Sequence, residues 1–344
     1  MNTNILNKIE QLIIQTNKTI ESLKDDNDLS SAKSYGFKLN SFRKAHKNIK
    51  CIDFKITSTD QLKNIKGIGK GIISRIEEII TTGELKELNS DADANDTSYK
   101  QIQNLQRITG IGPSNAKKMF NDGITLEKLL DTDISDSKNP LISKLTHHQL
   151  LGLKYFHDLE KRIPRKEIMS IEKKLKKYCN QIDTKLGLII CGSYRREAKD
   201  SGDIDMLLYS NNLENLDYTL KDVIDYLTEK GLIVDDLTIN GNTKYMGFCR
   251  NTPKSLARRI DIRLISKDSL APAMLYFTGS GDFNKNMRTY ALKKGYTINE
   301  YSIFKINKSK KKFEISVDSE EDIFKILDIP YYHPKDRLAS VHFE

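Results

Sequence analysis

The chain has 344 residues, 38% of them hydrophobic and 30% charged, which is enough for two or more compact units with apolar cores. Lysine and arginine exceed aspartate and glutamate by 56 − 47 = 9, an imbalance that favours an anionic partner such as nucleic acid. No apolar run approaches the roughly 18 residues of a membrane span, so we expect no membrane partner.

The four cysteines, at positions 51, 179, 191 and 249, show no metal-binding spacing and are typical of free thiols in a reducing compartment. The first residues lack the basic start and apolar block of a secretory signal. We therefore expect an intracellular protein in the nucleus, the cytoplasm or a viral replication site. The viral site is included because the abundance of Ile, Lys and Asn suggests an AT-rich genome.

Residues 5–90 are predicted to form short helices, since isoleucine and leucine recur there at helical spacing. A hexad with two glycines, Ile65–Lys70, lies between two of these helices, and a related sequence returns at 108–114. Each predicts a tight hairpin before a helix whose exposed N–H groups can bind a DNA phosphate without reading sequence. One such turn means little, but two copies in a basic chain favour paired helix-hairpin-helix motifs over plain helical turns.

The polar, acidic residues 91–98 are predicted to be a linker, with helices continuing over 99–160. From residue 186 the pattern becomes strand-rich, and Asn240-Gly241 suggests a tight hairpin between two strands. Strands are expected at 186–191, 203–209, 232–239, 243–249 and 259–265, a helix at 216–230, and, in a mixed last part, short strands near 296–306 and a helix near 320–327.

The strongest functional signal lies between residues 191 and 205. Asp203 and Asp205 are two residues apart on a predicted strand, so their carboxylates project from one face. Mg²⁺ binds a few carboxylates plus substrate phosphates, and two such ions can hold both oxygens of an in-line displacement. Another predicted strand offers a third carboxylate, Asp261, between two arginines that would keep it ionised.

A phosphate site is predicted just upstream. The turn at Gly192-Ser193 can place backbone N–H groups, the Ser193 hydroxyl and Arg196 around a triphosphate. Gly202 lets its backbone approach the same phosphates. An Asp-x-Asp pair alone is more often a solvated turn or strand edge, and Gly-Ser alone is a weaker signal. The order and spacing of these features together predict two-metal nucleotidyl transfer.

With these motifs in place, the chain from about Lys38 to Arg337 resembles family X DNA polymerases. The strings that carry the resemblance are Thr146–Phe156, Glu160–Arg165, Arg258–Leu264, Leu275–Ser280, Asn284–Arg288 and Thr297–Tyr301. Strings of this length in this order are highly specific. The implied α+β fold has a helical lyase-like domain at 1–95 with the first hairpin, a helical DNA-binding subdomain at 96–160 with the second, a catalytic palm with a mixed β-sheet at 161–270 and a small α/β nucleotide-selection subdomain at 271–344.

The resemblance implies a monomeric polymerase that fills short gaps in base excision repair, with gapped or nicked double-stranded DNA and dNTPs as substrates. It implies two Mg²⁺ ions, replaceable by Mn²⁺, at Asp203, Asp205 and Asp261. The implied nucleotide contacts are Ser193, Arg196, Gly202, Tyr276, Phe277, Gly279 and Asn284. Na⁺ or K⁺ is implied at the hairpin backbone carbonyls of Lys63, Ile65 and Ile68, and of Gln106, Ile108 and Ile111.

The resemblance also implies DNA contacts, with Lys285 at the templating base and Arg288 at the template minor groove. The remaining implied DNA contacts are Lys38, Lys63, Gly67, Gly69, Gly110, Gly112, Lys244 and Arg259.

The family's lyase nucleophile is a lysine, and the matching position here is Arg75. Arginine stays protonated and offers no free amine for a Schiff base, so a 5′-deoxyribose-phosphate lyase activity is doubtful. Two neighbouring basic positions become Gly71 and Glu87, and Lys70 is the nearest candidate for a substitute nucleophile. As a phosphate contact, Lys70 is an equally good interpretation.

Glu197 beside the phosphate cradle and Gly281 near the nucleotide base also depart from the family pattern, with no predicted direction of effect. Two other functions stay open: a template-independent terminal nucleotidyltransferase and a non-catalytic DNA-end scaffold. The short predicted hairpin at 232–249 leaves little room for a loop that replaces the template, and the three intact aspartates argue against a scaffold.

Overall fold

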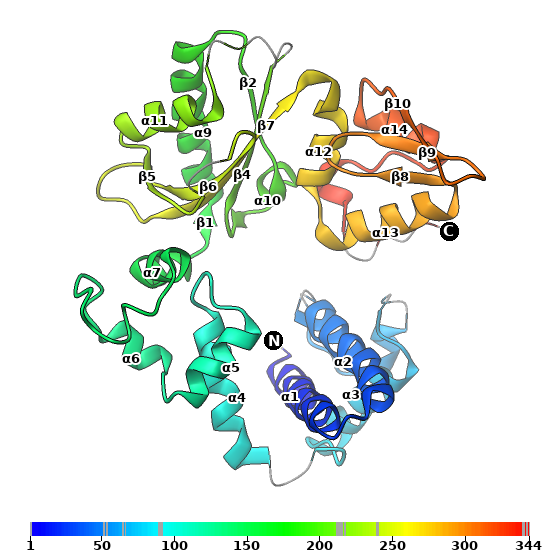
Figure 1. Ribbon diagram of the computed structural model, residues 1–344. Coiled ribbons are helices and arrows are strands. Elements are labelled where there is room, and N and C mark those ends of the chain that lie inside the picture. Colours follow the sequence, from blue (N-terminus) through cyan, green and yellow to red (C-terminus); the bar gives the residue numbers. More distant parts are fainter. Residues whose placement is uncertain are drawn as a thin grey trace. The chain divides into compact units, whose positions relative to one another are not determined.

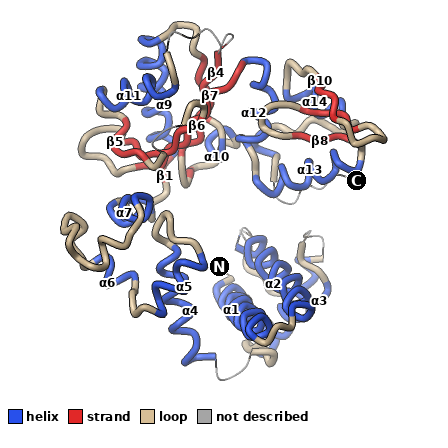
Figure 2. Tube along the Cα trace, in the orientation of Figure 1, coloured by secondary structure: helices blue, strands red, loops and turns tan. Residues whose placement is uncertain are grey.

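The computed structural model describes residues 2–343 except 51, 53, 64, 66, 89–91, 211–215, 217, 239, 240, 339, 340 and 342. The chain divides into two compact units, Met1–Arg107 with Ile111–Asp131, and Ile108–Gly110 with Thr132–Glu344. The described part of the first unit is helical, whereas the second mixes helices and sheets (Figures 1 and 2). This confirms the α+β class, while the four domain boundaries stay a prediction. No described helix is long and apolar enough to cross a membrane.

The first unit is built on α1, α2 and α3, whose isoleucine and leucine side chains form one core. Its members include Ile9, Leu12, Ile72 and Ile76, which lie at the spacing that places residues on one helix face. The elements of this unit are α1 (Thr3–Asp25), α2 (Leu29–Lys50), the 3-10 helix η1 (Thr59–Leu62), α3 (Lys70–Thr82), α4 (Ala92–Gln106), α5 (Pro113–Asn121) and α6 (Leu126–Leu130).

Both predicted glycine hairpins are present, and their backbone geometries match. Gly67 and Gly110 adopt φ angles of 96° and 91°. Gly69 and Gly112 are the N-caps of α3 and α5, with φ and ψ of −82° and 171°, and of −83° and 171°. The positive φ of Gly67 is a conformation that side-chain-bearing residues rarely adopt, so this turn favours glycine.

The predicted linker at 91–98 is wrong for most of its length, because α4 already begins at Ala92. A polar sequence does not distinguish a linker from a solvent-facing helix turn, because both lack apolar residues. Two other predicted positions, Lys66 in the first hairpin and Asn240 in the expected tight hairpin, lie outside the described residues.

A five-stranded sheet of order β2-β4-β7-β6-β5 is the centre of the second unit. These are the five predicted strands: β2 (Gly187–Ile190), β4 (Ile204–Ser210), β5 (Ile233–Asp236), β6 (Lys244–Cys249) and β7 (Arg258–Ser266). β4 and β7 run parallel, and the other neighbours are antiparallel. α9 (Arg165–Ile182) and α11 (Leu220–Glu229) cover one face, and α12 (Leu270–Thr278) packs on the other. Both faces of β4 are therefore held by packing.

Beyond α12, α13 (Gly281–Lys293) packs on a three-stranded antiparallel sheet of order β10-β9-β8. Its strands are β8 (Tyr296–Ile298), β9 (Ile303–Ile306) and β10 (Lys312–Ile315), followed by α14 (Glu320–Ile326). The predicted strands near 296–306 and the helix near 320–327 are thus confirmed. The remaining elements of the unit are α7 (His147–Lys154), α8 (Phe156–Leu159), β1 (Ile163–Pro164), α10 (Gly192–Arg195), β3 (Asp200–Ser201), and the 3-10 helices η3 (Lys267–Ser269) and η4 (Pro334–Asp336).

A buried ion network ties α10 to α12, α14 and the C-terminal segment. Glu320 accepts hydrogen bonds from Arg195, at 2.6 and 3.0 Å, and from Arg337, at 2.6 Å. The Glu320 side chain is 4% exposed and that of Arg337 is 0% exposed. Arg195 also donates to Oγ1 of Thr278 at 2.6 Å. A single carboxylate thus bridges two guanidinium groups that approach it from distant parts of the sequence.

We expect Glu320→Ala to lower the free energy of unfolding by about 3–5 kcal/mol, because it leaves two buried cations without a counter-charge. Asp225→Ala is the matched control, since its pair with Lys221 is exposed and should contribute less than about 1 kcal/mol. Urea unfolding followed by circular dichroism measures both changes. Equal decreases in the two variants would contradict the role assigned to the buried network.

Candidate active site

The sheet brings the three predicted carboxylates together. Asp205 and Asp261 are register partners on the parallel strands β4 and β7, so their Cα atoms are neighbours at the usual inter-strand spacing of about 4.8 Å. Asp203 lies just before β4, two residues from Asp205. Residues separated by two along a strand share a face, which turns Asp203 and Asp205 to one side. Three negative charges therefore meet at one edge of the sheet.

The charges of these carboxylates oppose one another. Burial, reinforced by the charges of Asp203 and Asp261, raises the pKa of Asp205 to about 7. Burial also raises the pKa of Asp261, although the neighbouring Arg259 guanidinium opposes this shift. Arg259 donates to both carboxylate oxygens of Asp261, at 3.2 and 3.3 Å. A group of acids that resists ionisation without a cation fits a divalent metal site.

The donor chemistry suits Mg²⁺, which prefers carboxylate oxygens. In the described part of the chain, however, no group of three or more ligand-type side chains already has metal-binding geometry. Both oxygens of the third carboxylate, Asp261, bond to Arg259 instead. Metal binding at all three residues stays a prediction.

The predicted phosphate cradle is attached directly to the carboxylates. Cys191 N–H donates to the backbone oxygen of Asp205 at 2.7 Å, and Gly192 follows with a φ of 55°. A Cβ at Gly192 would lie 2.2 Å from Oδ2 of Asp205, so only glycine fits this turn. Ser193 donates to Ser201 Oγ at 2.7 Å, which joins α10 to β3.

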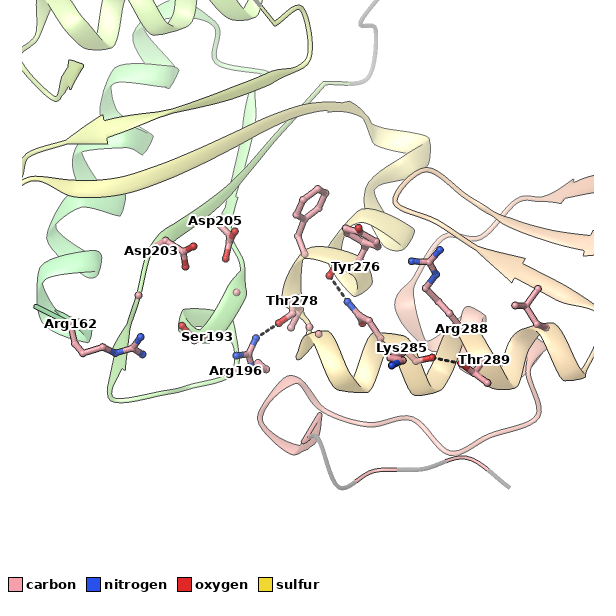
Figure 3. A pocket seen from close by; sticks show the side chains of 17 residues that line it. Arg162, Ser193, Arg196, Asp203, Asp205, Tyr276, Thr278, Lys285, Arg288 and Thr289 are labelled. Carbon is pink, nitrogen blue, oxygen red and sulfur yellow. Dashed lines mark hydrogen bonds between the residues drawn. The ribbon is translucent and has the colours of Figure 1, made fainter. Parts of the chain in front are cut away.

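The opposite wall of the site comes from α12 and α13. Arg196, at the end of α10, donates to the backbone oxygen of Thr278, and Asn284 donates to that of Tyr276 at 2.6 Å. Figure 3 shows Asp203, Asp205 and Ser193 on one side of the cavity and Tyr276, Lys285 and Arg288 on the other. The cavity has a volume of about 770 Å³.

Most of the predicted nucleotide and template contacts line this cavity. They are Ser193, Arg196, Gly202, Asp203, Asp205, Tyr276, Phe277, Gly279, Asn284, Lys285 and Arg288. Asp261 is not among the lining residues, consistent with its contact to Arg259. Gly192 of the predicted phosphate turn and Gly281, noted as a departure near the nucleotide base, line it too. Residues that the sequence analysis did not select also line it: Arg162, Thr278, Thr289 and Leu292. Arg162 lies inside one of the strings of the resemblance, which could have identified it.

A second cavity, also of about 770 Å³, lies in the first unit. Its lining includes the predicted DNA contacts Lys38, Lys63, Gly67 and Gly69, together with Lys44 and Arg75. Lys70, the candidate for a substitute nucleophile, does not line this cavity, whereas Lys38, Lys44 and Lys63 do. Lys70 is the first residue of α3.

The three departures from the family pattern in this unit, Gly71, Arg75 and Glu87, are physically connected, and the first two line the cavity. Arg75 donates to Glu87 from Nε at 2.6 Å and from Nη2 at 2.5 Å, and from Nη1 to the backbone oxygen of Gly71 at 2.8 Å. Its guanidinium also lies over the ring of Phe42, 5.2 Å from the centroid. Arg75 is thus a fixed cation, held by the residues that differ with it.

The predicted DNA contacts Gly110, Gly112, Lys244 and Arg259 line neither cavity, whereas Ile65 and Ile68 of the first hairpin line the second one. Gly110 accepts a hydrogen bond from Gln149 at 3.3 Å, and Gly112 caps α5. Lys244 begins β6 opposite Arg263 of β7. The carbonyl of Ile65 accepts the N–H of Ile68 at 3.1 Å, and the monovalent cation at the hairpin carbonyls stays a prediction.

We expect Asp205→Asn to stabilise the metal-free protein at pH 8. The folded pKa of about 7 exceeds the ordinary value of 3.8, so ionisation destabilises the fold above pH 7, and this cost fades as pH falls towards 4. At about 1.4 kcal/mol per pKa unit, the gain is up to about 4 kcal/mol at pH 8 and smaller at pH 5.

Thermal unfolding in chelator at both pH values measures the effect of Asp205→Asn. Asp222→Asn is the control, because hydrogen bonds from Thr219 lower the pKa of that exposed carboxyl. A stability gain independent of pH would contradict the charge crowding.

Comparison with known proteins gives four family matches in chain order. They are a helix-hairpin-helix domain at residues 10–85, the fingers domain of DNA polymerase lambda at 103–160, the DNA polymerase beta palm at 162–267 and the DNA polymerase beta thumb at 273–338. The palm match contains all three aspartates, and the thumb match contains the wall formed by the end of α12 and by α13.

Individual relatives agree with these matches. The chain is 30% identical over 314 residues to DNA polymerase lambda of Arabidopsis thaliana, covering 86% of this chain and 57% of that protein. It is 28% identical over 308 residues to DNA polymerase lambda of Rattus norvegicus, covering 86% and 52%. It is 26% identical over 334 residues to DNA nucleotidylexotransferase of Xenopus laevis, covering 87% and 63%.

The chain thus spans about half to less than two thirds of the length of these relatives. With helix-hairpin-helix, fingers, palm and thumb matched in order, the chain belongs to the family X DNA polymerases.

Proposed function

We propose that this chain is a template-directed DNA polymerase that fills short gaps in base excision repair, with dNTPs and gapped DNA as substrates. The observation that carries the proposal is the position of Asp203 and Asp205 beside the Gly192–Arg196 turn, in one cavity with the end of α12 and with α13. Nucleotidyl transfer requires carboxylates that can bind metal ions next to a backbone turn that can bind phosphate groups.

The proposed reaction joins the primer 3′-oxygen to the α-phosphorus of a dNTP and releases pyrophosphate. Ser193, Arg196 and the N–H groups of α10 bind the triphosphate, and Tyr276, Phe277 and Gly279 line the sugar side of the cavity. Asn284 orients the incoming base. When bound at the three aspartates, Mg²⁺ supplies neutralisation of phosphate charge and a more acidic 3′-hydroxyl.

Replacing Asp261 by Ala should abolish primer extension, because the third carboxylate is removed, but it should leave DNA affinity within about threefold of the parent. Single-nucleotide incorporation and equilibrium binding on one preparation test this. Arg259→Gln is a useful comparison, since it frees Asp261 from its ion pair while keeping the carboxylate. Primer extension by the Asp261→Ala enzyme would contradict the assignment of Asp261 as a catalytic carboxylate.

A comparison of two DNA substrates distinguishes template-directed synthesis from terminal transfer. Gapped DNA should be extended much faster than an unpaired single strand, and only the nucleotide complementary to the template should be incorporated efficiently. If single-stranded primers were extended as fast as gapped DNA, the terminal-transferase alternative would be favoured instead. Any metal-dependent incorporation excludes the scaffold alternative.

The first-unit cavity is proposed to bind the 5′-phosphate across the gap without Schiff-base chemistry. Arg75 stays protonated, and its contacts to Glu87 and Gly71 hold it in place. We expect the parent protein to fill a gap that carries a 5′-deoxyribose phosphate while borohydride traps no protein–DNA adduct. Arg75→Lys, which puts an amine at this position, should yield a trapped adduct.

Lys44→Ala is the control for the lyase test, because Lys44 also lines the cavity. A trapped adduct with the parent protein would contradict the prediction. Disappearance of that adduct in Lys44→Ala would then identify the nucleophile.

A further inference from the structure

The hairpin between β9 and β10 carries a concentration of positive charge that neither the active site nor the first-unit cavity uses. Five of the eight residues from Lys305 to Lys312 are lysines, and we call this segment the lysine hairpin. Its lysines are Lys305, Lys308, Lys310, Lys311 and Lys312, all of them exposed. None of them forms an ion pair with another described residue. The charge therefore faces solvent without compensation.

The tip of the lysine hairpin is ordered rather than frayed. Asn307 donates its N–H to the Lys311 carbonyl at 3.0 Å and accepts the Lys310 N–H at 2.9 Å on its own carbonyl. Its side-chain oxygen accepts the Lys311 N–H at 2.9 Å. Lys310 adopts a φ of 60°, which closes the turn. One asparagine thus fixes the backbone that displays the lysines, which lowers the entropic cost of binding an anion there.

An aromatic side chain lies among these charges. Phe313 is 55% exposed and is the cross-strand partner of Lys305, which in turn pairs with Tyr296 of β8. Cross-strand partners project from the same face of a sheet, so the Lys305 side chain lies between two aromatic ones. Lysines that can bind phosphates beside an exposed ring on which a base can stack are typical of sites for single-stranded nucleic acid.

The lysine hairpin continues the surface that leads out of the active site. Lys285, Arg288 and Leu292 of α13 line the cavity at helical spacing. The chain then reaches Gly295, whose carbonyl accepts the Ile306 N–H at 2.7 Å, at the start of the hairpin tip. Figure 1 shows the C-terminal end of α13 and the β8–β9–β10 sheet in the same part of the second unit.

We infer that the lysine hairpin binds the unpaired template strand beyond the templating base, with its lysines on phosphates and Phe313 against a base. This inference rests on the proposed function, in which Lys285 and Arg288 face the template. At about 1.5 Å per helical residue, the end of α13 at Lys293 lies about 7.5 Å beyond Arg288. At about 3.4 Å per nucleotide, the tip is reached after roughly three to six nucleotides.

The test compares template overhangs of two and twelve unpaired nucleotides. A variant with Lys308, Lys310, Lys311 and Lys312 changed to Gln should bind the twelve-nucleotide overhang at least tenfold more weakly at moderate salt. The slope of its salt dependence should fall by about 0.7 for each phosphate that the lysines no longer neutralise. With the two-nucleotide overhang, its affinity and its single-nucleotide incorporation should match those of the parent.

The control variant changes to Gln four exposed lysines in and after α9, which covers the face of the five-stranded sheet opposite to α12. They are Lys173, Lys176, Lys177 and Lys185. It has the same net charge as the hairpin variant and should bind both overhangs like the parent. Equal weakening in the two variants, or on both overhangs, would overturn the inference. Inactivity of the parent protein on the short overhang would instead contradict the proposed function.

Two further measurements identify the occupant. Phe313→Ala should weaken binding of the twelve-nucleotide overhang and leave the two-nucleotide overhang unchanged. Annealing a complementary strand to the overhang should reduce the effect of the hairpin variant, because paired bases cannot stack on Phe313. A larger effect with the annealed strand would mean that duplex DNA is the ligand, and the inference would be wrong.

Discussion

Repulsion among three carboxylates is the constraint on which the active site depends. The parallel pairing of β4 and β7 puts Asp205 beside Asp261, and Asp203 follows from the alternation of the strand. Helices on one face and α12 on the other hold β4, so these acids cannot separate. The fold thus keeps an electrostatic strain that a divalent cation would relieve, and the other parts of the site surround this point.

Several arginines of the chain, in both units, are fixed by acids rather than left mobile. Arg195 is fixed by Glu320, Arg259 by Asp261 and Arg75 by Glu87. A fixed guanidinium loses less entropy on binding than a mobile lysine, but it is also a poorer source of reactive amine. The lysine hairpin differs, because its backbone is ordered while its side chains remain unpaired.

The sequence predicts those parts of the site whose residues lie close together along the chain. Asp203, Asp205 and the two glycine hairpins lie within local motifs whose geometry follows from strand alternation and from the freedom of glycine. The contact of Glu320 with Arg195 joins residues 125 positions apart, and that of Arg75 with Glu87 needs the chain to turn back after α3. No local pattern specifies such pairs. The start of α4 was missed for another reason, since polar residues are equally common in linkers and on exposed helix turns.

The close approach of the Gly192 turn to Asp205 has a thermodynamic consequence. The turn proposed to bind the triphosphate is joined to β4 by the hydrogen bond from Cys191 to Asp205 and leaves no room for a Cβ beside the Asp205 carboxylate, so a shift of one disturbs the other. A ligand that stabilises one arrangement of the turn therefore changes the free energy of occupying the carboxylates. By linkage, the effect is equal in the reverse direction. Under the proposed function, we therefore expect nucleotide and cation to act on this site as heterotropic partners, each setting the apparent affinity of the other.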